Sequence, residues 1–177
     1  MNKVKILLDA DVVIDFIDGQ QLSILPRILP DYDFVILDIV LNQELGKLHT
    51  TKQYIERQIE WFKSSPKLSI LEWKPDKETL QIYSLLLRTK GKGESACMAY
   101  CQTHHDVLAS CNLRDTKIYC EEHGITYITF LDLIWYAWQR KVLSEEECNK
   151  CIQDVIAAGN NIPDIPIAYY TPTISNL

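Results

Sequence analysis

The stretch that decides the fold is residues 5–14, KILLDADVVI. A short apolar run ends at Asp9, and the apolar residues after it continue with helical spacing, which indicates a buried strand followed directly by a helix. Further strand-then-helix patterns occur in residues 34–45, 68–89 and 107–123. Strands that alternate with helices favour a mostly parallel sheet covered on both faces. The sequence therefore predicts an α/β protein with a three-layer α/β/α architecture.

The predicted elements fill most of the chain. Strands are expected at residues 5–8, 34–37, 68–73, 107–110 and 126–130. Helices are expected after Asp9 and at residues 22–29, 38–48, 50–64, 76–89, 94–100, 114–123, 131–140 and 144–158. We assign residues 1–160 to a single domain that includes the closing helices, and residues 161–177 to a proline-rich tail.

Composition narrows the class of protein. The 177 residues are 47% hydrophobic and 24% charged, which fits one ordinary globular domain and excludes a disordered chain. No stretch approaches the roughly 18 consecutive apolar residues of a membrane helix. Six cysteines without an export signal at the start of the sequence favour reduced thiols and a cytoplasmic location. A net charge of −6 argues against a protein that coats nucleic acid, but it does not exclude a nuclease with an acidic metal site.

Polar residues follow the predicted strands where ligands bind in open parallel sheets. Asp9 ends the first strand, Glu44 lies on the helix after the second, and Glu94 follows a break at Gly91-Lys92-Gly93. Asn112 and Asp115 follow the strand that ends at residue 110. Any single acid at a strand end is more often a helix cap than a ligand. Together these acids favour a site for a hard divalent cation, provided that they converge.

Four segments carry a resemblance to a known family. Residues 7–14 (LLDADVVI) resemble the opening motif of PIN-domain nucleases, and residues 38–45 (DIVLNQEL) resemble their second motif. Residues 91–96 (GKGESA) are similar to a Gly-x-Gly-Glu variant of the third motif. Residues 109–115 (ASCNLRD) look like the Thr-x-Asn-x-x-Asp pattern of VapC-type members. The resemblance extends over about residues 3–133.

The resemblance implies a metal-dependent endoribonuclease of PIN-like fold. Its acidic, metal-binding set would be Asp9, Glu44, Glu94 and Asp115, with Asn112 orienting a water or a ligand. One or two Mg²⁺ or Mn²⁺ ions would activate a water and stabilise the leaving oxygen. The family also implies a homodimer and, if this chain is the toxin of a toxin–antitoxin pair, an antitoxin protein as partner. Asp11 stands where the family often has a small hydroxyl or amide residue, so its carboxylate either joins the site or caps the helix.

Basic residues flank these motifs. They are Lys47, Lys90, Lys92, Arg114 and Lys117. We expect them to bind the phosphate backbone of RNA, since cations at the rim of an acidic metal site serve that purpose. The alternative is a solvated surface with ordinary ion pairs one helical turn apart.

Two other functions remain open on the sequence alone. One is a catalytically inactive PIN-like module that binds RNA or a protein. The other is a different metal-dependent phosphohydrolase on a similar sheet. Residues 131–140 form a helix that is apolar on much of its circumference, which indicates either deep burial or a subunit contact.

Overall fold

A computed structural model of the chain describes residues 3–43, 68–112 and 114–177, except for the side chain of Asp115. Its strands form one parallel sheet in the order β3-β2-β1-β4-β5. The strands are β1 (Lys5–Leu8), β2 (Asp33–Leu37), β3 (Leu68–Leu71), β4 (Val107–Ala109) and β5 (Tyr127–Ile128). β1 lies in the centre, where Leu7 is in register with Val35 of β2 and Leu108 of β4.

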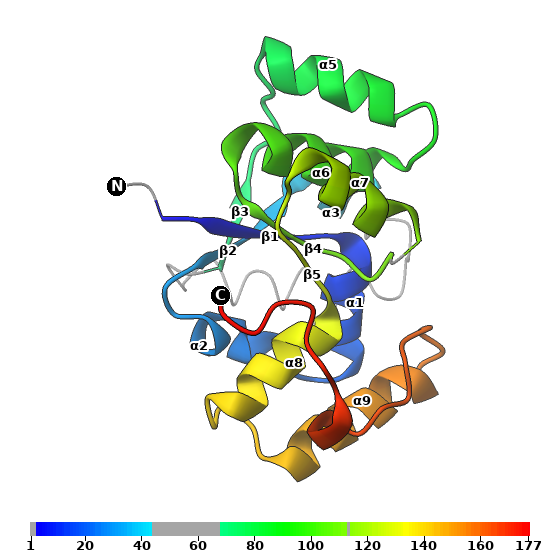
Figure 1. The fold of residues 1–177 in the computed structure, drawn as a ribbon. Coiled ribbons are helices and arrows are strands. Elements are labelled where there is room, and N and C mark those ends of the chain that lie inside the picture. The colour runs from blue at the N-terminus through cyan, green and yellow to red at the C-terminus, as the bar shows by residue number, and fades with distance from the viewer. Residues whose placement is uncertain (1–2, 44–67, 113) are drawn as a thin grey trace.

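Helices cover both faces of the sheet, so the predicted three-layer fold is confirmed (Figure 1). One layer holds α3 (Asp38–Gln43), α5 (Lys77–Leu86), α6 (Lys92–His104) and α7 (Asp115–His123). The other holds α1 (Ala10–Asp18), α2 (Leu25–Ile28), α8 (Phe130–Gln139) and α9 (Glu145–Ala157). Two 3₁₀ helices, η1 (Leu22–Ile24) and η3 (Ile167–Tyr169), complete the described elements.

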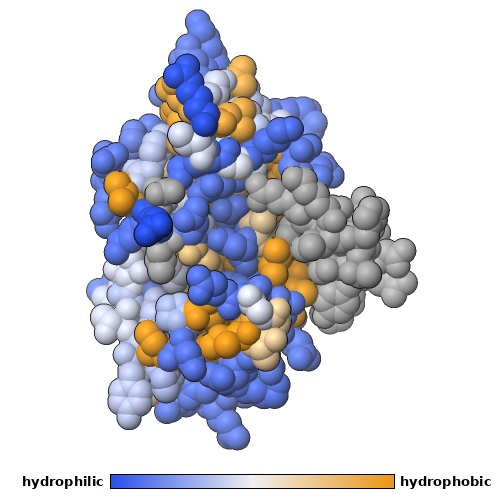
Figure 2. Space-filling view, turned by 90° about the vertical axis from the view of Figure 1, so that its right-hand side faces the viewer, coloured by the Kyte–Doolittle hydropathy of each residue, from blue (hydrophilic) through white to orange (hydrophobic). Residues whose placement is uncertain are grey.

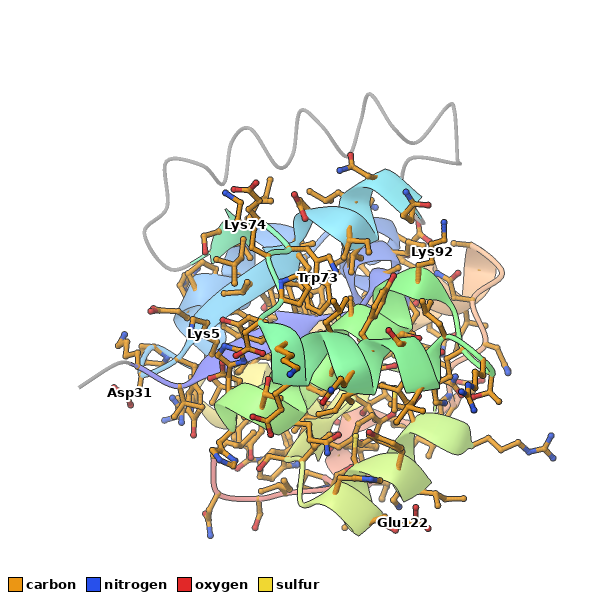
Figure 3. All side chains as sticks on the ribbon, turned by 90° about the horizontal axis from the view of Figure 1, so that it is seen from above. Lys5, Asp31, Trp73, Lys74, Lys92 and Glu122 are labelled. Atoms are coloured by element: carbon orange, nitrogen blue, oxygen red, sulfur yellow. The ribbon has the colours of Figure 1, made fainter. Side chains whose placement is uncertain are left out.

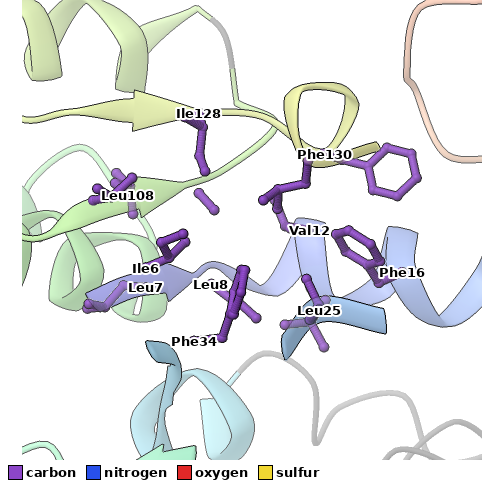
Figure 4. Close-up of a cluster of buried hydrophobic side chains, with 14 of the residues drawn as sticks. Ile6, Leu7, Leu8, Val12, Phe16, Leu25, Phe34, Leu108, Ile128 and Phe130 are labelled. Carbon is purple, nitrogen blue, oxygen red and sulfur yellow. The ribbon is translucent and has the colours of Figure 1, made fainter. Parts of the chain in front are cut away.

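The core fills the space between the sheet and the second helix layer (Figure 4). Ile6 and Leu8 on β1 are fully buried, and the rings of Phe16 on α1 and Phe130 on α8 meet edge to face at 5.0 Å. Edge-to-face packing of aromatic rings adds to the stabilisation from burial. The continuous apolar run of β1 is thus explained by its central position, because a central parallel strand is buried on both faces.

The apolar helix at residues 131–140 is α8, and it is buried within this chain. It packs against α2, α9 and η3, and the hydroxyl of Tyr136 donates a hydrogen bond to the carbonyl of Ile174 in the tail. Burial inside one chain therefore accounts for its composition without a subunit contact. The homodimer remains a prediction.

Several element boundaries differ from the sequence prediction; for example, the helix expected at 76–89 spans Lys77–Leu86, and the one expected at 22–29 is divided into η1 and α2. The helix expected from residue 94 begins at Lys92, because Gly91 already has the extended backbone of a helix N-cap and places Glu94 in the first turn. The strand expected at 126–130 spans only 127–128, since Thr129 caps α8. The strand expected at 68–73 ends at Leu71. The helix expected at 50–64 lies outside the described residues.

The tail after α9 runs back along α8 and α9 (Figure 1). Asp132 on α8 is fully buried and accepts hydrogen bonds from the hydroxyl of Tyr170 at 2.9 Å and from the backbone N–H of Thr173 at 2.7 Å. The side chain of Asn149 accepts a hydrogen bond from the backbone N–H of Ile167 at 2.8 Å. Among the described residues, no helix is long and apolar enough to cross a membrane.

Candidate functional site

Asp9 lies at the carboxyl edge of the sheet, between β1 and α1. Its carboxylate accepts a hydrogen bond from the backbone N–H of Ala10 at 2.8 Å, which caps α1, and its own N–H donates to the carbonyl of Ala109 at 2.9 Å. The second bond joins the ends of β1 and β4. Asp9 is only 5% exposed, so its carboxylate is held in a fixed place.

Asp11 connects α1 to the segment after β4. One carboxylate oxygen accepts hydrogen bonds from the backbone N–H of Cys111 at 2.9 Å and from the hydroxyl of Ser110 at 3.4 Å, while the other accepts from the N–H of Val12 at 2.7 Å. The two segments are about a hundred positions apart in the sequence. Asp11 therefore lies beside the segment that carries Asn112 and also accepts a hydrogen bond from the first turn of α1, which is compatible with both roles that the sequence left open.

Glu94, in the first turn of α6, joins the same neighbourhood from the opposite layer. Its Oε1 accepts hydrogen bonds from the side-chain amide of Asn112 at 2.9 Å and from the hydroxyl of Thr116. Lys90 lies one turn earlier, with its ammonium 3.4 Å from the same oxygen. The predicted pair Glu94 and Asn112 is thus in direct contact.

The charges of the site influence one another. Burial raises the pKa of Asp11, N–H donation from Cys111 and Val12 opposes the shift, and the negative charge of Glu94 adds to it. A carboxylate whose charge is destabilised by a neighbouring carboxylate suits a hard cation, since such ions take oxygen ligands. The chemistry of these donors therefore fits Mg²⁺ or Mn²⁺.

The donor set is nevertheless partial in the part of the chain that the structure describes. There, no group of three or more His, Cys, Asp or Glu side chains is arranged to hold a metal ion. Glu44 lies outside the described residues, as does Lys47. Asp115 is the first residue of α7, but its side chain is not described. Convergence of the four predicted acids therefore stays a prediction; the structure shows Glu94 in contact with Asn112 and near enough to Asp11 for its charge to raise the pKa of Asp11.

A buried acid, Asp15, lies one turn after Asp11 on α1. The thiol of Cys111 donates a hydrogen bond to its carboxylate at 3.1 Å. Burial raises the pKa of Asp15 to about 7; the thiol hydrogen bond opposes the shift, and the charges of Asp11 and Asp18 add to it. Burial also raises the pKa of Cys111 well above its usual value, so the thiol stays protonated and is not a nucleophile.

Asp11, Asp15, Cys111 and Asn112 line a groove of about 490 Å³, and Asp9 and Glu94 are not among its lining residues. The rest of the lining comes from Ile14, Arg114 and residues 160–162, which follow α9. Figure 2 shows the face onto which the strand ends point, where hydrophilic side chains surround a hydrophobic patch. The groove is open and mixes carboxylate, amide, guanidinium and aliphatic groups, which is the composition of a site for a polar ligand.

A larger hollow of about 650 Å³ lies between α5 and α7. Leu85 and Ile118 line it and are more than half exposed. It contains none of the carboxylates near the ends of β1 and β4. The smaller groove has two acids, Asp11 and Asp15, in its lining, and we therefore take it as the candidate binding groove.

The predicted basic residues have different surroundings. Lys90 is paired with Glu94, and Lys117 has only a 4.0 Å contact with Glu121 on the same helix. Lys92 donates to the side chain of Gln43 at 3.4 Å and lies at the opposite end of the molecule from Lys5 and Asp31 (Figure 3). Arg114 is exposed, lines the groove and has no ion pair with a described residue. Of the four that the structure describes, Arg114 is therefore the best placed to meet an anion in the groove.

Sequence reasoning missed Asp15, Cys111 and residues 160–162 as parts of this site. The spacing of Asp11, Asp15 and Asp18 was the available signal, because residues three and four apart share one helix face. The contribution of residues 160–162 has no comparable sequence signal. It depends on how the chain turns after α9.

Two solved structures resemble this fold. VapBC2 from Rickettsia felis, in a crystal structure bound to a DNA fragment from their promoter, matches with a TM-score of 0.54 at 14% identity, covering 71% of this chain and 98% of that chain. VapBC-1 from nontypeable Haemophilus influenzae matches with a TM-score of 0.51 at 17% identity over the same shares of the two chains. The chain has a VapC-like PIN fold. No family model matches the sequence, and no curated protein does.

Proposed function

We propose that the chain is a metal-dependent endoribonuclease of the VapC-like PIN type that hydrolyses phosphodiester bonds. The observation that carries the proposal is the hydrogen bond from Asn112 to Glu94, together with the bonds from Ser110 and Cys111 to Asp11. They bring three of the four segments of the sequence resemblance into contact with one another, and two of these segments line the groove. The fold supports the proposal, because this edge of a parallel sheet is where ligands bind.

Asp9, Glu44, Glu94 and Asp115 would hold Mg²⁺ or Mn²⁺ in this proposal. When bound, the ion supplies an activated water and stabilises negative charge on the phosphate and the leaving oxygen. The residues of the chain provide the positioning. Asn112 fixes the carboxylate of Glu94.

Arg114 lines the groove and has no ion pair with a described residue, and the planar fork of its guanidinium matches a phosphate group. Asp11 accepts hydrogen bonds from the hydroxyl of Ser110 and the backbone N–H of Cys111, so it fixes the segment that carries both Asn112 and Arg114. No covalent nucleophile is required, and the protonated thiol of Cys111 does not provide one.

The direct test is cleavage of a labelled single-stranded RNA in Mn²⁺ and in a chelator. We expect cleavage only with the metal, and a loss of at least about a hundredfold in Asp9→Asn, which keeps the size of the side chain and removes its charge. Asp31→Asn, a change in an exposed acid on the far side of the sheet, is the matched control and should cleave like the wild type. Equal cleavage by Asp9→Asn would overturn the assignment.

A second function, an inactive PIN-like module that binds RNA or a protein, is favoured by one observation. Oε1 of Glu94 is already occupied by an amide, a hydroxyl and an ammonium, which together neutralise much of its charge. Retained RNA binding without metal-dependent cleavage would select this reading. Turnover of a phosphate monoester with RNA left intact would select a different phosphohydrolase.

The similarity to VapBC complexes supports a toxin role, with an antitoxin protein as partner. Controlled expression in a bacterial host tests this role. Wild-type protein should arrest growth, and Asp9→Asn should not. Normal growth with soluble wild-type protein would contradict the toxin role while leaving the nuclease chemistry to the cleavage assay.

A further inference from the structure

Residues 160–162 line part of the groove but take no part in the proposed chemistry. We call this part of the lining the wall. Asn160, Asn161 and Ile162 follow α9, yet they line the same groove as Asp11 and Arg114 at the start of α1 and of α7. Hydrolysis of a phosphodiester needs none of their side chains. Because they line the same groove as Asp11, they are placed to bind a ligand there.

The wall is held rigidly. Gly159 has a φ of +97°, which lets the chain turn sharply after α9, and the side-chain amide of Asn160 donates to the carboxylate of Asp18 at 2.7 Å. The backbone N–H of Asn160 also bonds to the carbonyl of Val155 at 3.3 Å. A surface fixed before binding loses little conformational entropy when a ligand arrives.

The wall presents groups that remain available. The side chain of Asn161 is exposed and has no hydrogen bond to any described residue, and that of Ile162 is half-buried. A primary amide offers donors and an acceptor together, which matches the edge of a nucleobase. An aliphatic side chain packs against the face of a base or a ribose.

The opposite side of the groove complements this surface. Arg114 provides a cation for a phosphate, and Asn112 provides a second amide. The volume of about 490 Å³ lies within the range of about 300–1,000 Å³ found for small-ligand pockets, which accommodates one nucleotide. Base edges are accessible in this way only where the RNA is single-stranded, because paired bases bury them.

We propose that residues 160–162 form a nucleotide-binding wall, in which Asn161 binds the edge of one base of a single-stranded RNA and Ile162 packs against that nucleotide, while Arg114 binds its phosphate. This inference rests on the proposed ribonuclease function and gives that site a means of selecting its substrate. In this proposal Asn161 determines specificity, whereas the predicted acids carry out the chemistry.

The test measures binding separately from cleavage. A fluorescently labelled single-stranded RNA of mixed sequence is titrated with protein in a chelator, and anisotropy gives the dissociation constant. We expect Asn161→Ala and Ile162→Ala each to weaken binding at least about fivefold. Asn176→Ala, which changes an exposed asparagine at the far end of the tail, should stay within about twofold of the wild type.

An abasic oligonucleotide with the same ribose-phosphate backbone distinguishes the two parts of the subsite. Wild type and Asn161→Ala should bind the abasic oligonucleotide equally. Arg114→Ala should weaken binding to both oligonucleotides, and the number of counterions released, given by the slope of log affinity against log salt concentration, should fall by about one. Thermal unfolding of each variant checks that it is folded. Because Asn161 is exposed, its replacement should leave the unfolding midpoint nearly unchanged.

The outcomes separate this inference from the proposed function. The proposed role of residues 160–162 is contradicted if folded Asn161→Ala binds the RNA with wild-type affinity. It is also contradicted if the wild-type protein does not bind the RNA. If the wild type cleaves RNA but Asn161→Ala binds it normally, the nuclease stands and the wall fails. If binding depends on Asn161 but no cleavage occurs, the wall stands and the nuclease fails.

Discussion

Acidic residues along α1 differ in their hydrogen-bond donors, although burial raises the pKa of both Asp11 and Asp15. Asp11 accepts hydrogen bonds from two backbone N–H groups, which favour its ionised form, whereas Asp15 is buried with a thiol as its donor. A thiol is a weak donor and compensates little for lost water. Asp15 thus has few compensating hydrogen bonds, and burial raises its pKa to about 7.

We expect Asp15→Asn to change how stability depends on pH. The folded-state pKa of Asp15 is about 7 against an ordinary value of 3.8, so below pH 4 the group is protonated in both states and carries no penalty. Between pH 4 and 7, the carboxyl group of Asp15 is ionised in the unfolded chain but still protonated in the folded state. The free energy of unfolding therefore falls as the pH rises through this range. The variant should therefore be more stable than the wild type above pH 7, by about 2–4 kcal/mol.

Urea unfolding at pH 4, 6 and 8 measures the effect. The difference between the two proteins should grow with pH and level off above 7, while Asp31→Asn should run parallel to the wild type. A constant difference at every pH would show that Asp15 does not titrate in this range.

At the scale of elements, α1 and α9 meet at Gly19. A Cβ atom at this position would lie 2.5 Å from Sγ of Cys151 and 3.1 Å from Cγ2 of Val155. The φ of Gly19 is −74°, which any residue adopts, so only the close packing requires glycine. This contact matters to the site because α9 leads into the wall at residues 160–162.

Gly19→Ala should destabilise the fold by about 1–3 kcal/mol through overpacking. Cys151→Ala removes the sulfur that the new methyl group would meet. The double variant should therefore be more stable than the sum of the two single changes indicates, as measured by a double-mutant cycle in urea. If the two changes in the free energy of unfolding add without any coupling, the methyl group introduced by Gly19→Ala does not meet Sγ of Cys151.

The tail is attached to α8 through Asp132. Tyr170→Phe removes the hydroxyl that donates to its buried carboxylate and should cost about 1–2 kcal/mol, with faster proteolysis of the tail. Tyr169→Phe is the matched control, because the neighbouring ring is 82% exposed and its change should cost almost nothing. Equal stability of the two variants would mean that the hydrogen bond to Asp132 contributes little.

The elements differ in how far the sequence predicts them. Strands β1 and β2 follow from compact apolar runs, and the capping box Ser144–Glu147 identifies the start of α9. The start of α6 was misjudged because glycines usually break a chain, whereas Gly91 here serves as the N-cap. Contacts of the tail with Asp132 depend on tertiary packing, which no local pattern encodes.

On the scale of the whole molecule, the site is an assembly of segments far apart in the sequence. Asp9, Glu94 and Asn112 were predicted because the carboxyl ends of parallel strands meet at one edge. Asp15 and the wall were not predicted, since one is an apparently ordinary helix residue and the other follows the last helix. The parallel sheet therefore determines where the acids gather, and the closing helices determine what else lies beside them.

The most direct test of the central claim, that this edge binds a divalent cation, is titration of the purified protein with Mn²⁺ by calorimetry. Wild type and Asp31→Asn should bind with the same affinity, and Asp9→Asn and Glu94→Gln should each bind at least about tenfold more weakly. Identical binding by all four folded proteins, or no binding by the wild type, would contradict the claim.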